Sequence, residues 1–204
     1  MNISASIDTK INYVSGYARL LHDLLNIDNR DFSILSSNCI GGMVYRLSGR
    51  KYLTPTVNLN FTTSDFLKFA SDPKHYCKQK LEFINSSLEI GYPIARLGDL
   101  QINFMHYKDN NQAEEYWIRR SKRINYSNIY LMMTDRDGFN PKDLATFDSI
   151  ECVDKVCFTA KRYEQSFVQQ IPEYSHQDYV GDLYTNRHLF AGNFSFSKWL
   201  SKNQ

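Results

Sequence analysis

The sequence predicts a single α/β domain, built as three α/β/α layers around a mostly parallel sheet of about five or more strands. Its 204 residues match one large domain with its own core, and 42% hydrophobic against 23% charged residues is an ordinary globular balance. Short apolar runs alternate with helical patterns, and the stretches between the runs are long enough for parallel crossovers. We find no internal repeat or linker, so residues 1–204 are taken as one domain.

The N-terminal region, residues 1–30, is expected to form a helix. Between residues 9 and 25 the apolar side chains recur at the spacing of one helix face, and Asp8 or Thr9 stands where a cap belongs. The residues of this face are Ile11, Val14, Tyr17, Ala18, Leu21 and Leu25.

Strands and helices are expected to alternate between residues 32 and 163. Pro55 precedes one strand, Thr62 to Asp65 form a typical helix cap, and Pro141 suits the first turn of a helix. The expected strands are 32–35, 56–61, 102–105, 128–133 and 155–158, and the expected helices are 43–47, 66–70, 76–86, 111–123 and 141–147. Residues 164–204 have a weaker pattern, which predicts an irregular segment packed on the body with Trp199 and Leu200 docked.

The charge balance and the absence of targeting signals limit where the protein works. The 24 Lys and Arg nearly match the 22 Asp and Glu, so nucleic-acid binding by the chain as a whole is not expected. The N-terminus has no basic stretch followed by an apolar one, and no apolar run approaches the roughly 20 residues that span a bilayer. We therefore expect a cytoplasmic protein with reduced thiols and no transmembrane segment, with peripheral membrane contact left open.

Polar residues follow each predicted strand, and in parallel sheets these strand ends meet at the edge where ligands bind. The first such segment is Ser36-Ser37-Asn38-Cys39-Ile40-Gly41-Gly42. Glycines at a helix start let backbone N–H groups approach an anion, and the helix dipole would lower the pKa of Cys39. The alternative is that Gly41 and Gly42 serve close helix–strand packing and that Cys39 is a small core residue. The segment is neither a Walker loop nor a dinucleotide-binding fingerprint.

His106 follows the predicted strand 102–105, with Tyr107 and Lys108 directly after it. An imidazole at a strand end can act as a general acid or base, or can bind a sugar or a phosphate. The alternative is an edge histidine that is hydrogen-bonded to the backbone.

Asp135-Arg136-Asp137 follows the strand 128–133, and Lys161 follows the strand 155–158. Carboxylates at this spacing can hold a divalent cation that bridges a nucleotide-sugar diphosphate, while turn chemistry explains Asp137 before Gly138 equally well. Arg136 and Lys161, with Lys108, can hold the anionic part of a donor. The four cysteines lack the paired short spacing of a zinc site, so no resident metal is expected; they are Cys39, Cys77, Cys152 and Cys157.

Residues 119–123, Arg-Arg-Ser-Lys-Arg, place four cations on a predicted helix. Glu114 and Glu115 balance them, and Glu115 stands one turn before Arg119, so a solvated face is the favoured interpretation. An anchor for a phosphate or for an anionic membrane is the alternative.

Several of these segments together resemble a bacterial family of unknown function, the DUF1919 family, whose members are often labelled exopolysaccharide biosynthesis proteins. The resemblance runs from about Phe32 to Thr159, with a weaker echo at 196–200. Its carriers are 36–42, Tyr45, 54–57, 92–94, 104–108, 113–120, 123–125 and 134–138. The family pattern at the first segment is Ser-Asn-Asn-Cys-Trp-Gly-Gly, so Ser37 and Ile40 depart from it while Cys39 and both glycines match. The resemblance implies an association with surface polysaccharide production and carries over no catalytic residue.

We therefore expect an enzyme of exopolysaccharide biosynthesis, a transferase that moves an acyl or glycosyl group onto a glycan or activated-sugar precursor. Cys39 would be the nucleophile or support an oxyanion, and His106 would be the acid or base, with acyl-coenzyme A or a nucleotide sugar as donor. One alternative is a non-catalytic partner or regulator of a polysaccharide-assembly enzyme, recognisable by an exposed apolar patch on the aromatic-rich C-terminal residues. Another is a hydrolase that uses the same loop on esters.

Overall fold

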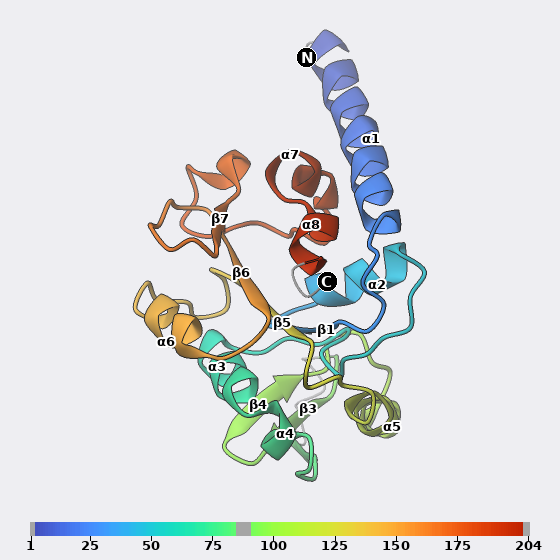
Figure 1. Cartoon of the computed structure of the whole chain (residues 1–204), viewed down its shortest axis with the longest axis vertical. Coiled ribbons are helices and arrows are strands. Elements are labelled where there is room, and N and C mark those ends of the chain that lie inside the picture. Colours follow the sequence, from blue (N-terminus) through green and yellow to red (C-terminus); the bar gives the residue numbers. More distant parts are fainter. Residues whose placement is uncertain (1–2, 85–90, 202–204) are drawn as a thin grey trace.

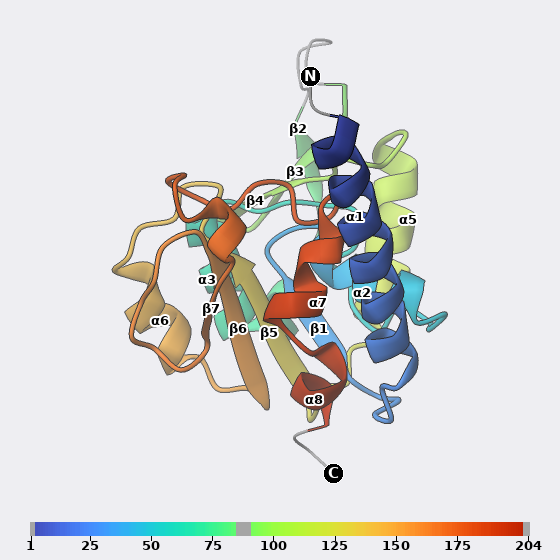
Figure 2. The same ribbon diagram turned by 90° about the horizontal axis from the view of Figure 1, so that it is seen from above.

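The computed structural model describes residues 3–84 and 91–201, and it confirms a mixed α/β fold (Figures 1 and 2). In these ranges the chain forms a four-stranded parallel sheet in the order β1-β5-β6-β7 and a three-stranded antiparallel sheet in the order β2-β3-β4. The parallel strands are β1 (Ser33–Ser36), β5 (Ile129–Thr134), β6 (Asp154–Thr159) and β7 (Val168–Gln170). The antiparallel strands are β2 (Glu82–Ile84), β3 (Ile94–Leu97) and β4 (Leu100–Asn103).

The helices fall before, between and after these strands. They are α1 (Ile3–Leu25), α2 (Ile40–Leu47), α3 (Thr63–Ser71), α4 (Pro73–Tyr76), α5 (Asn110–Ser121), α6 (Asp143–Ser149), α7 (Phe190–Asn193) and α8 (Phe196–Leu200). Two short 3₁₀ helices, η1 (Pro172–Tyr174) and η2 (Arg187–Leu189), complete the C-terminal part. No helix in the described ranges has the length and apolar character to cross a bilayer.

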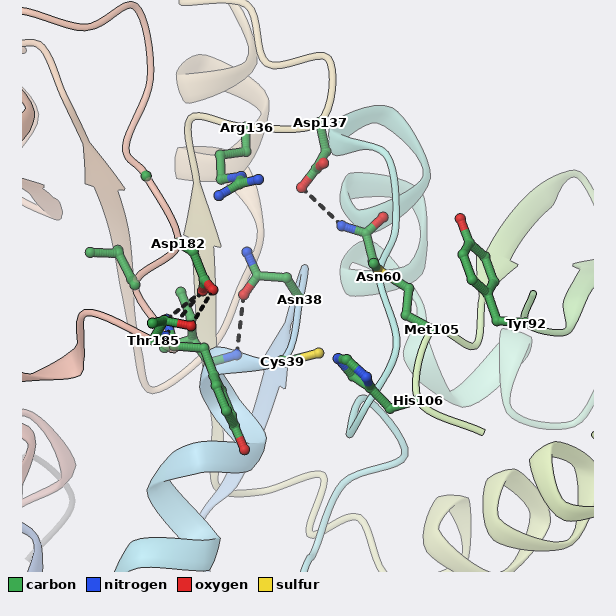
Figure 3. Close-up of a pocket in the computed structure, with 14 residues that line it drawn as sticks. Asn38, Cys39, Asn60, Tyr92, Met105, His106, Arg136, Asp137, Asp182 and Thr185 are labelled. Atoms are coloured by element: carbon green, nitrogen blue, oxygen red, sulfur yellow. Dashed lines mark hydrogen bonds between the residues drawn. The ribbon is translucent and has the colours of Figure 1, made fainter. Parts of the chain in front are cut away.

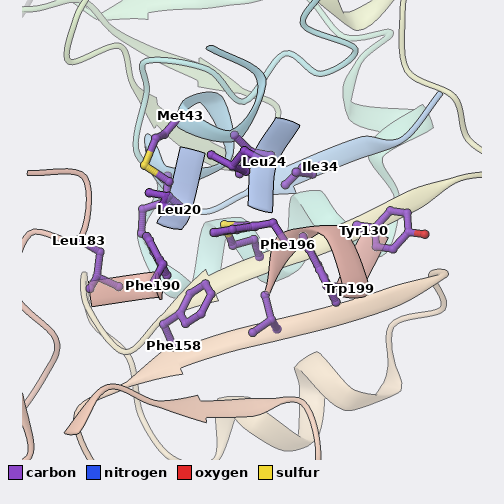
Figure 4. Close-up of a cluster of buried hydrophobic side chains, with 14 of the residues drawn as sticks. Leu20, Leu24, Ile34, Met43, Tyr130, Phe158, Leu183, Phe190, Phe196 and Trp199 are labelled. Carbon is purple, nitrogen blue, oxygen red and sulfur yellow. The ribbon is translucent and has the colours of Figure 1, made fainter. Parts of the chain in front are cut away.

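Both faces of the parallel sheet are buried, because successive residues of a strand point to opposite sides. On β5, Tyr130 and Met132 belong to one hydrophobic cluster, whereas Leu131 and Met133 belong to another. The first cluster is formed with α1, α2, α7 and α8 (Figure 4), and the second with α3, α5, α6 and the antiparallel sheet. Figure 1 shows α7 and α8 on one side of the parallel strands and α3 with the antiparallel sheet on the other.

Three of the expected strands, at 32–35, 128–133 and 155–158, are confirmed as β1, β5 and β6, which pair in parallel. The expected three layers with five or more strands are not confirmed, because the parallel sheet has four strands in the described ranges. Its fourth strand, β7, lies within the segment 164–204 that was expected to be irregular. That segment does dock its end as expected, with Trp199 only 5% exposed and Leu200 fully buried.

The expected strand at 102–105 is instead the antiparallel strand β4, which ends at Asn103. Leu97 pairs with Leu100 across a two-residue turn, and Gly98 adopts φ +63° in that turn. A left-handed glycine at this position is what a tight hairpin requires, so the chain reverses here and does not cross over.

The expected strand at 56–61 is wrong apart from one bridge between Asn60 and Asn103. The segment runs beside β1, the edge strand of the parallel sheet, but side-chain oxygens take the positions that a partner strand would fill. The N–H of Ser36 donates to Thr56 Oγ1 at 3.0 Å, and the N–H of Ile34 donates to the Tyr45 hydroxyl at 3.0 Å. Because hydroxyls satisfy the edge, a β-rich sequence lies next to the sheet without joining it.

The expected helix at 76–86 is also wrong in its described part, and residues 85 and 86 lie outside the described ranges. Helix α4 is capped by Asp72, which accepts from the N–H of His75 at 2.9 Å, and it ends at Tyr76. The chain then forms β2, where Phe83 pairs with Ala95 of β3. Pairing with a distant strand thus overrides the local helical pattern.

Helix α1 begins at Ile3, before the expected cap at Asp8 or Thr9, and it packs with a different face from the expected one. Leu20 and Leu24 are fully buried, whereas Ile11 and Val14 are 59% and 66% exposed. The inward face is set by Gly16, where an added Cβ would lie 2.8 Å from the carbonyl oxygen of His188. The helices expected at 43–47, 66–70, 111–123 and 141–147 correspond to α2, α3, α5 and α6.

Candidate functional site

A cavity of about 620 Å³ lies at the carboxyl ends of β1 and β5 (Figure 3). Six separated parts of the chain form its wall, all of them loops or the first residue of α2. The lining residues are Asn38, Cys39, Ile40, Asn60, Tyr92, Met105, His106, Arg136, Asp137, Gly181, Asp182, Leu183, Tyr184 and Thr185. The position agrees with the general rule that open parallel sheets bind ligands beyond the carboxyl ends of their strands.

Asn38 fixes the loop between β1 and α2. Its Nδ2 donates to Thr134 Oγ1 at 3.1 Å, which ties this loop to the end of β5. Its Oδ1 accepts from the N–H of Ile40 at 3.2 Å, shown as a dashed line in Figure 3. The first amide of α2 is therefore already bonded within the protein.

The two glycines of this loop serve helix–strand packing. A Cβ at Gly41 would lie 2.7 Å from the Cβ of Ser36, and a Cβ at Gly42 would lie 3.1 Å from Val57 Cγ1. Ser36 and Ser37 are buried, and neither they nor the glycines line the cavity. The structure thus favours the packing interpretation of Gly41 and Gly42, and of this segment only Asn38, Cys39 and Ile40 face the cavity.

The expectation that the helix position lowers the pKa of Cys39 is wrong. Burial, and next the negative charge of Asp182, raise the pKa of this thiol to about 11. Its Sγ lies 3.7 Å from the carbonyl oxygen of Leu59, to which it donates a weak hydrogen bond. Cys39 is therefore a neutral thiol at neutral pH, although its sulfur points toward the ring of His106 (Figure 3).

His106 lies in the loop after β4 and directs its ring into the cavity (Figure 3). Its backbone N–H donates to the carbonyl oxygen of Asn58 at 3.2 Å. Asn58 adopts φ +62°, a left-handed conformation that asparagine tolerates better than most residues. The sequence-predicted pair Cys39 and His106 is thus brought to one wall.

Tyr107 and Lys108 do not accompany His106 into the cavity. Tyr107 is buried, and its hydroxyl donates to the carbonyl oxygen of Val57 at 2.7 Å and accepts from Arg120 Nη1 at 2.6 Å. Burial raises the pKa of Tyr107 to about 12. Lys108 is exposed and lies outside the cavity wall.

The basic segment 119–123 is only partly the solvated face that the sequence favoured. Arg119 forms the expected ion pair with Glu115, with Nη1 and Oε1 at 3.2 Å. Arg120 is only 8% exposed, and its guanidinium lies over the rings of Tyr52 and Tyr116, each 4.8 Å from the centroid.

The segment 135–137 is divided between structure and cavity. Asp135 is buried and accepts from the N–H of Ala160 at 2.7 Å and from the N–H of Val180 at 2.8 Å, while burial raises its pKa. Arg136 and Asp137 line the cavity. Asp135 therefore works as a clamp that joins the ends of β5 and β6 to the loop at 180.

Asp137 closes one side of the cavity. Its Oδ2 accepts from Asn60 Nδ2 at 2.9 Å, and its backbone has φ +57°, as the turn interpretation requires (Figure 3). Lys161 lies outside the cavity wall and donates to the carbonyl oxygen of Ser175 at 3.1 Å. The described residues contain no group of three or more His, Cys, Asp or Glu arranged to hold a metal ion.

The loop 181–185 is the part of the wall that sequence reasoning missed. Asp182 accepts from the N–H of Tyr184 at 2.9 Å and from both the N–H and the hydroxyl of Thr185. Burial opposes ionisation of Asp182, but these hydrogen bonds and the charge of Arg136 outweigh it and lower its pKa. The available signal was the Gly181-Asp182 pair, a turn motif inside a stretch without any helical or strand pattern.

These observations define an α/β protein with a mixed-charge, amide-rich cavity at the carboxyl edge of a parallel sheet. The chain belongs to the family described as Domain of unknown function (DUF1919), which it matches over residues 13–201. It is similar to an uncharacterized protein of Haemophilus influenzae (strain ATCC 51907 / DSM 11121 / KW20 / Rd), with 33% identity over 180 residues that cover 86% of each chain. The family match includes most of α1 and the C-terminal segment, both outside the main range of the resemblance seen in the sequence.

Proposed function

We propose that the cavity binds a glycan or activated-sugar precursor and that the protein is a transferase of cell-surface polysaccharide synthesis. The observation that carries this proposal is the composition of one wall region, where the amides of Asn38 and Asn60 meet two carboxylates and a guanidinium. Amides and carboxylates hydrogen-bond sugar hydroxyls in both directions, which a purely basic site cannot do. The volume of about 620 Å³ is in the range of small-molecule sites.

In the proposed reaction His106 is the general base, because it is the imidazole in this wall. It removes a proton from an acceptor hydroxyl, whose oxygen forms a bond to the acyl or anomeric carbon of the donor. The bond from that carbon to the leaving group breaks, and the electron pair departs with a thiolate of coenzyme A or a nucleotide phosphate. Arg136 stabilises the anionic part of the donor, and the proton on His106 then passes to the leaving group or to water.

This transfer is direct, without a covalent intermediate on Cys39. A thiol with a pKa of about 11 is almost entirely protonated at neutral pH and attacks carbonyl groups slowly. The same fact speaks against a cysteine hydrolase, and the burial of Ser36 and Ser37 leaves no observation that favours a serine hydrolase.

The test uses His106→Gln and Arg136→Gln, with Lys161→Gln as the control outside the cavity. His106→Gln should lower product formation by about 10²- to 10⁴-fold while leaving donor binding intact, because it removes the base alone. Arg136→Gln should abolish the thermal stabilisation by nucleotide sugars or by acyl-coenzyme A, and Lys161→Gln should change neither. A folded His106→Gln variant that makes wild-type amounts of surface glycan would overturn the assignment.

A second candidate, a non-catalytic partner of a polysaccharide-assembly enzyme, is favoured by one observation on α1. Ile11, Val14 and Leu25 are 59%, 66% and 68% exposed, and they recur at the spacing of one helix face. Within the part of the C-terminal segment that the structure describes, the expected patch is not found, because Phe190 and Phe196 are fully buried and Tyr179, at 54% exposed, is the one large hydrophobic residue there that is exposed. Suppose that Ile11→Ser combined with Val14→Ser abolishes surface glycan while donor binding and His106-dependent turnover persist. A partner role is then supported in addition to catalysis. If His106→Gln makes a normal amount of surface glycan, catalysis by this residue is excluded.

A further inference from the structure

The cavity at the strand ends has two ends of different chemistry, with His106 between them. In the view of Figure 3, Arg136 and Asp182 lie to the left of His106, and Tyr92 lies to the right, beyond Met105. The proposed reaction uses the charged end for the donor and leaves the end at Tyr92 without a role. A cavity of about 620 Å³ is in the range that holds drug-sized ligands, so it has room for a sugar ring beside the transferred group.

Hydrogen bonds between three backbone segments hold the end at Tyr92 in shape. Asn60 and Asn103 exchange two backbone hydrogen bonds, of 2.8 and 3.0 Å. The N–H of the next residue, Phe104, donates to the carbonyl oxygen of Pro93 at 2.9 Å. The three segments therefore lie side by side, and the residues that they bring to the cavity wall are Asn60, Tyr92, Met105 and His106.

Tyr92 is a half-buried residue whose ring has no partner in the part of the chain that the structure describes. Apart from Tyr179, every other tyrosine there has a ring, a cation or a hydrogen-bonding side chain as partner. Tyr179 is 54% exposed and lies outside this cavity, whereas Tyr92 lines it. The cavity therefore has room for the partner that the Tyr92 ring lacks.

Two neighbours give this end an apolar and a polar surface. Met105 is 43% exposed although it is a large apolar side chain, so a ligand that covers it gains free energy from burial. Asn60 donates from Nδ2 to Asp137, which fixes the orientation of its amide. Figure 3 shows the Asn60 Oδ1 turned to the side of Tyr92, and this oxygen accepts no hydrogen bond within the described ranges.

A pyranose ring matches this combination of surfaces better than an acyl chain does. Its faces carry C–H groups, which the negative face of an aromatic ring attracts, and its edge carries hydroxyl groups that donate to an amide oxygen. An acyl chain would cover the apolar surface but would leave the Asn60 Oδ1 without a donor, which is unfavourable once water is displaced.

We propose that the end at Tyr92 is the subsite for the acceptor sugar. Its pyranose ring stacks on Tyr92 and packs against Met105, while an edge hydroxyl donates to the Asn60 Oδ1. Another hydroxyl of the same sugar is the one from which His106 removes the proton. This inference rests on the transferase function proposed above, because it assigns the acceptor to the end of the cavity that the donor does not use.

Binding of simple glycosides tests the subsite directly. The probes are the methyl glycosides of glucose, galactose, mannose and N-acetylglucosamine, and sorbitol is the blank because it is a polyol without a ring. Saturation-transfer NMR should show saturable transfer from the protein to the ring C–H protons of at least one glycoside, and none to sorbitol. The absence of saturable transfer to any of the four glycosides overturns the proposal. Decanoate binding that depends on Tyr92, without glycoside binding, marks an acyl-chain site and overturns it as well.

Substitutions test whether the aromatic ring is the cause. Tyr92→Leu should weaken glycoside binding about three- to tenfold because the stacking is lost, whereas Tyr92→Phe should bind nearly as tightly as the wild type. Tyr179→Leu is the matched control, since Tyr179 also lacks a partner in the described ranges but lies outside the cavity. Equal weakening by Tyr92→Phe would mean that the hydroxyl, and not the ring, binds the sugar, and would overturn the stacking.

Met105→Gln gives a second test that does not depend on the folding of Tyr92→Leu, because the Met105 side chain is already 43% exposed. It should also weaken glycoside binding, since it removes apolar surface from the same subsite. Thermal unfolding shows which variants are folded. Wild-type binding by the folded variants at both positions overturns the proposal.

The donor separates a failure of this subsite from a failure of the transferase function. Tyr92→Leu should leave the thermal stabilisation by nucleotide sugars or acyl-coenzyme A unchanged, in contrast to Arg136→Gln. If surface glycan depends on His106 while Tyr92→Leu binds glycosides like the wild type, the acceptor subsite is wrong and the transferase function stands. If glycoside binding depends on Tyr92 while His106→Gln makes normal surface glycan, the sugar site stands and the transferase function fails.

Discussion

The cavity at the strand ends differs from a smaller cavity of about 290 Å³, between the end of α4 and the C-terminal half of α5, in how its wall is built and in the charge that it presents. The larger one is walled by loops that side chains such as Asn38 and Asp135 hold in place, and it contains charges of both signs. The smaller one is walled by residues of α4 and α5 and of the segments that follow them, and its charged lining residues are all lysines. Mixed charge with amides suits a polyhydroxy ligand, whereas a single sign suits an anion.

Each cavity also contains one cysteine, and here the two do not differ. The pKa of Cys39 and the pKa of Cys77 are both raised to about 11, in each case chiefly by burial. The three lysines around the smaller cavity do not lower the pKa of Cys77, so burial dominates over nearby charge. The comparison shows that the charges in a cavity wall do not lower the pKa of the cysteine beside them.

The largest expected effect concerns these thiols. At pH 8 a thiol of pKa about 11 is ionised about a hundredfold less than one of pKa 9, so Cys39 and Cys77 should alkylate about a hundredfold more slowly than a free thiol. Iodoacetamide labelling followed by peptide mass spectrometry gives the rate at each cysteine. Fast labelling of Cys39 but not of Cys77 would show that the two thiols differ in pKa, and it would support Cys39 as a nucleophile.

The next effect concerns the clamp of the larger cavity. Asp135→Asn replaces one acceptor oxygen by an NH₂ group, so either Ala160 or Val180 loses its partner, and stability should fall by about 1–3 kcal/mol. Urea denaturation measures this. Leu144→Met is a volume-matched control that leaves the clamp intact.

The pH dependence of the same variant has a defined sign. The folded pKa of Asp135 is raised above its ordinary value of 3.8, so folding favours the protonated form. The wild type should therefore lose stability relative to Asp135→Asn as the pH rises from 3.8 through the raised pKa. If the wild type instead gains stability relative to Asp135→Asn as the pH rises, ionised Asp135 is the better partner for the two amides.

A comparable effect is expected where α2 packs against β1, beside the same cavity. Gly41→Ala would place a Cβ 2.7 Å from the Cβ of Ser36 and should destabilise the fold by about 1–3 kcal/mol. Gly192→Ala is the matched control, because nothing lies within 4 Å of an added Cβ there and the change should be neutral or slightly stabilising. If thermal unfolding shows Gly41→Ala to be harmless, the glycine is present for another reason, such as ligand approach.

The smallest effect is expected on the outer surface of α5, the helix that walls the smaller cavity. Glu115→Gln breaks an ion pair with Arg119 whose side chains are 65% and 47% exposed, so unfolding should change by less than about 0.5 kcal/mol. A larger loss in the free energy of unfolding would mean that this surface ion pair contributes to holding α5 in place.

The sequence predicted the central strands because each carries a short apolar run bounded by polar residues. β1, β5 and β6 are found where such runs were recognised, and the polar ends of β1 and β5 do meet at one cavity. Local patterns therefore located Asn38, Cys39, His106, Arg136 and Asp137.

What the sequence did not predict depends on contacts between distant parts of the chain. The strand at 56–61 failed because Thr56 and Tyr45 offer hydroxyls to β1, and nothing in a local pattern shows where a hydroxyl will point. The loop 181–185 was missed because a carboxylate 45 residues earlier, Asp135, holds it in place. The pKa of Cys39 was misjudged because a helix position is visible in a sequence whereas burial is not.

The hydroxyls along β1 have a consequence beyond the single molecule. An edge strand normally presents a row of free N–H and C=O groups to which a strand of another chain can add, and this is how many sheet proteins aggregate. Here the outward N–H groups of Ile34 and Ser36 are already bonded, and Thr56 also donates to the carbonyl oxygen of Ile34 at 3.4 Å. Two side chains thus keep this edge of the parallel sheet from acting as a template for intermolecular strand pairing.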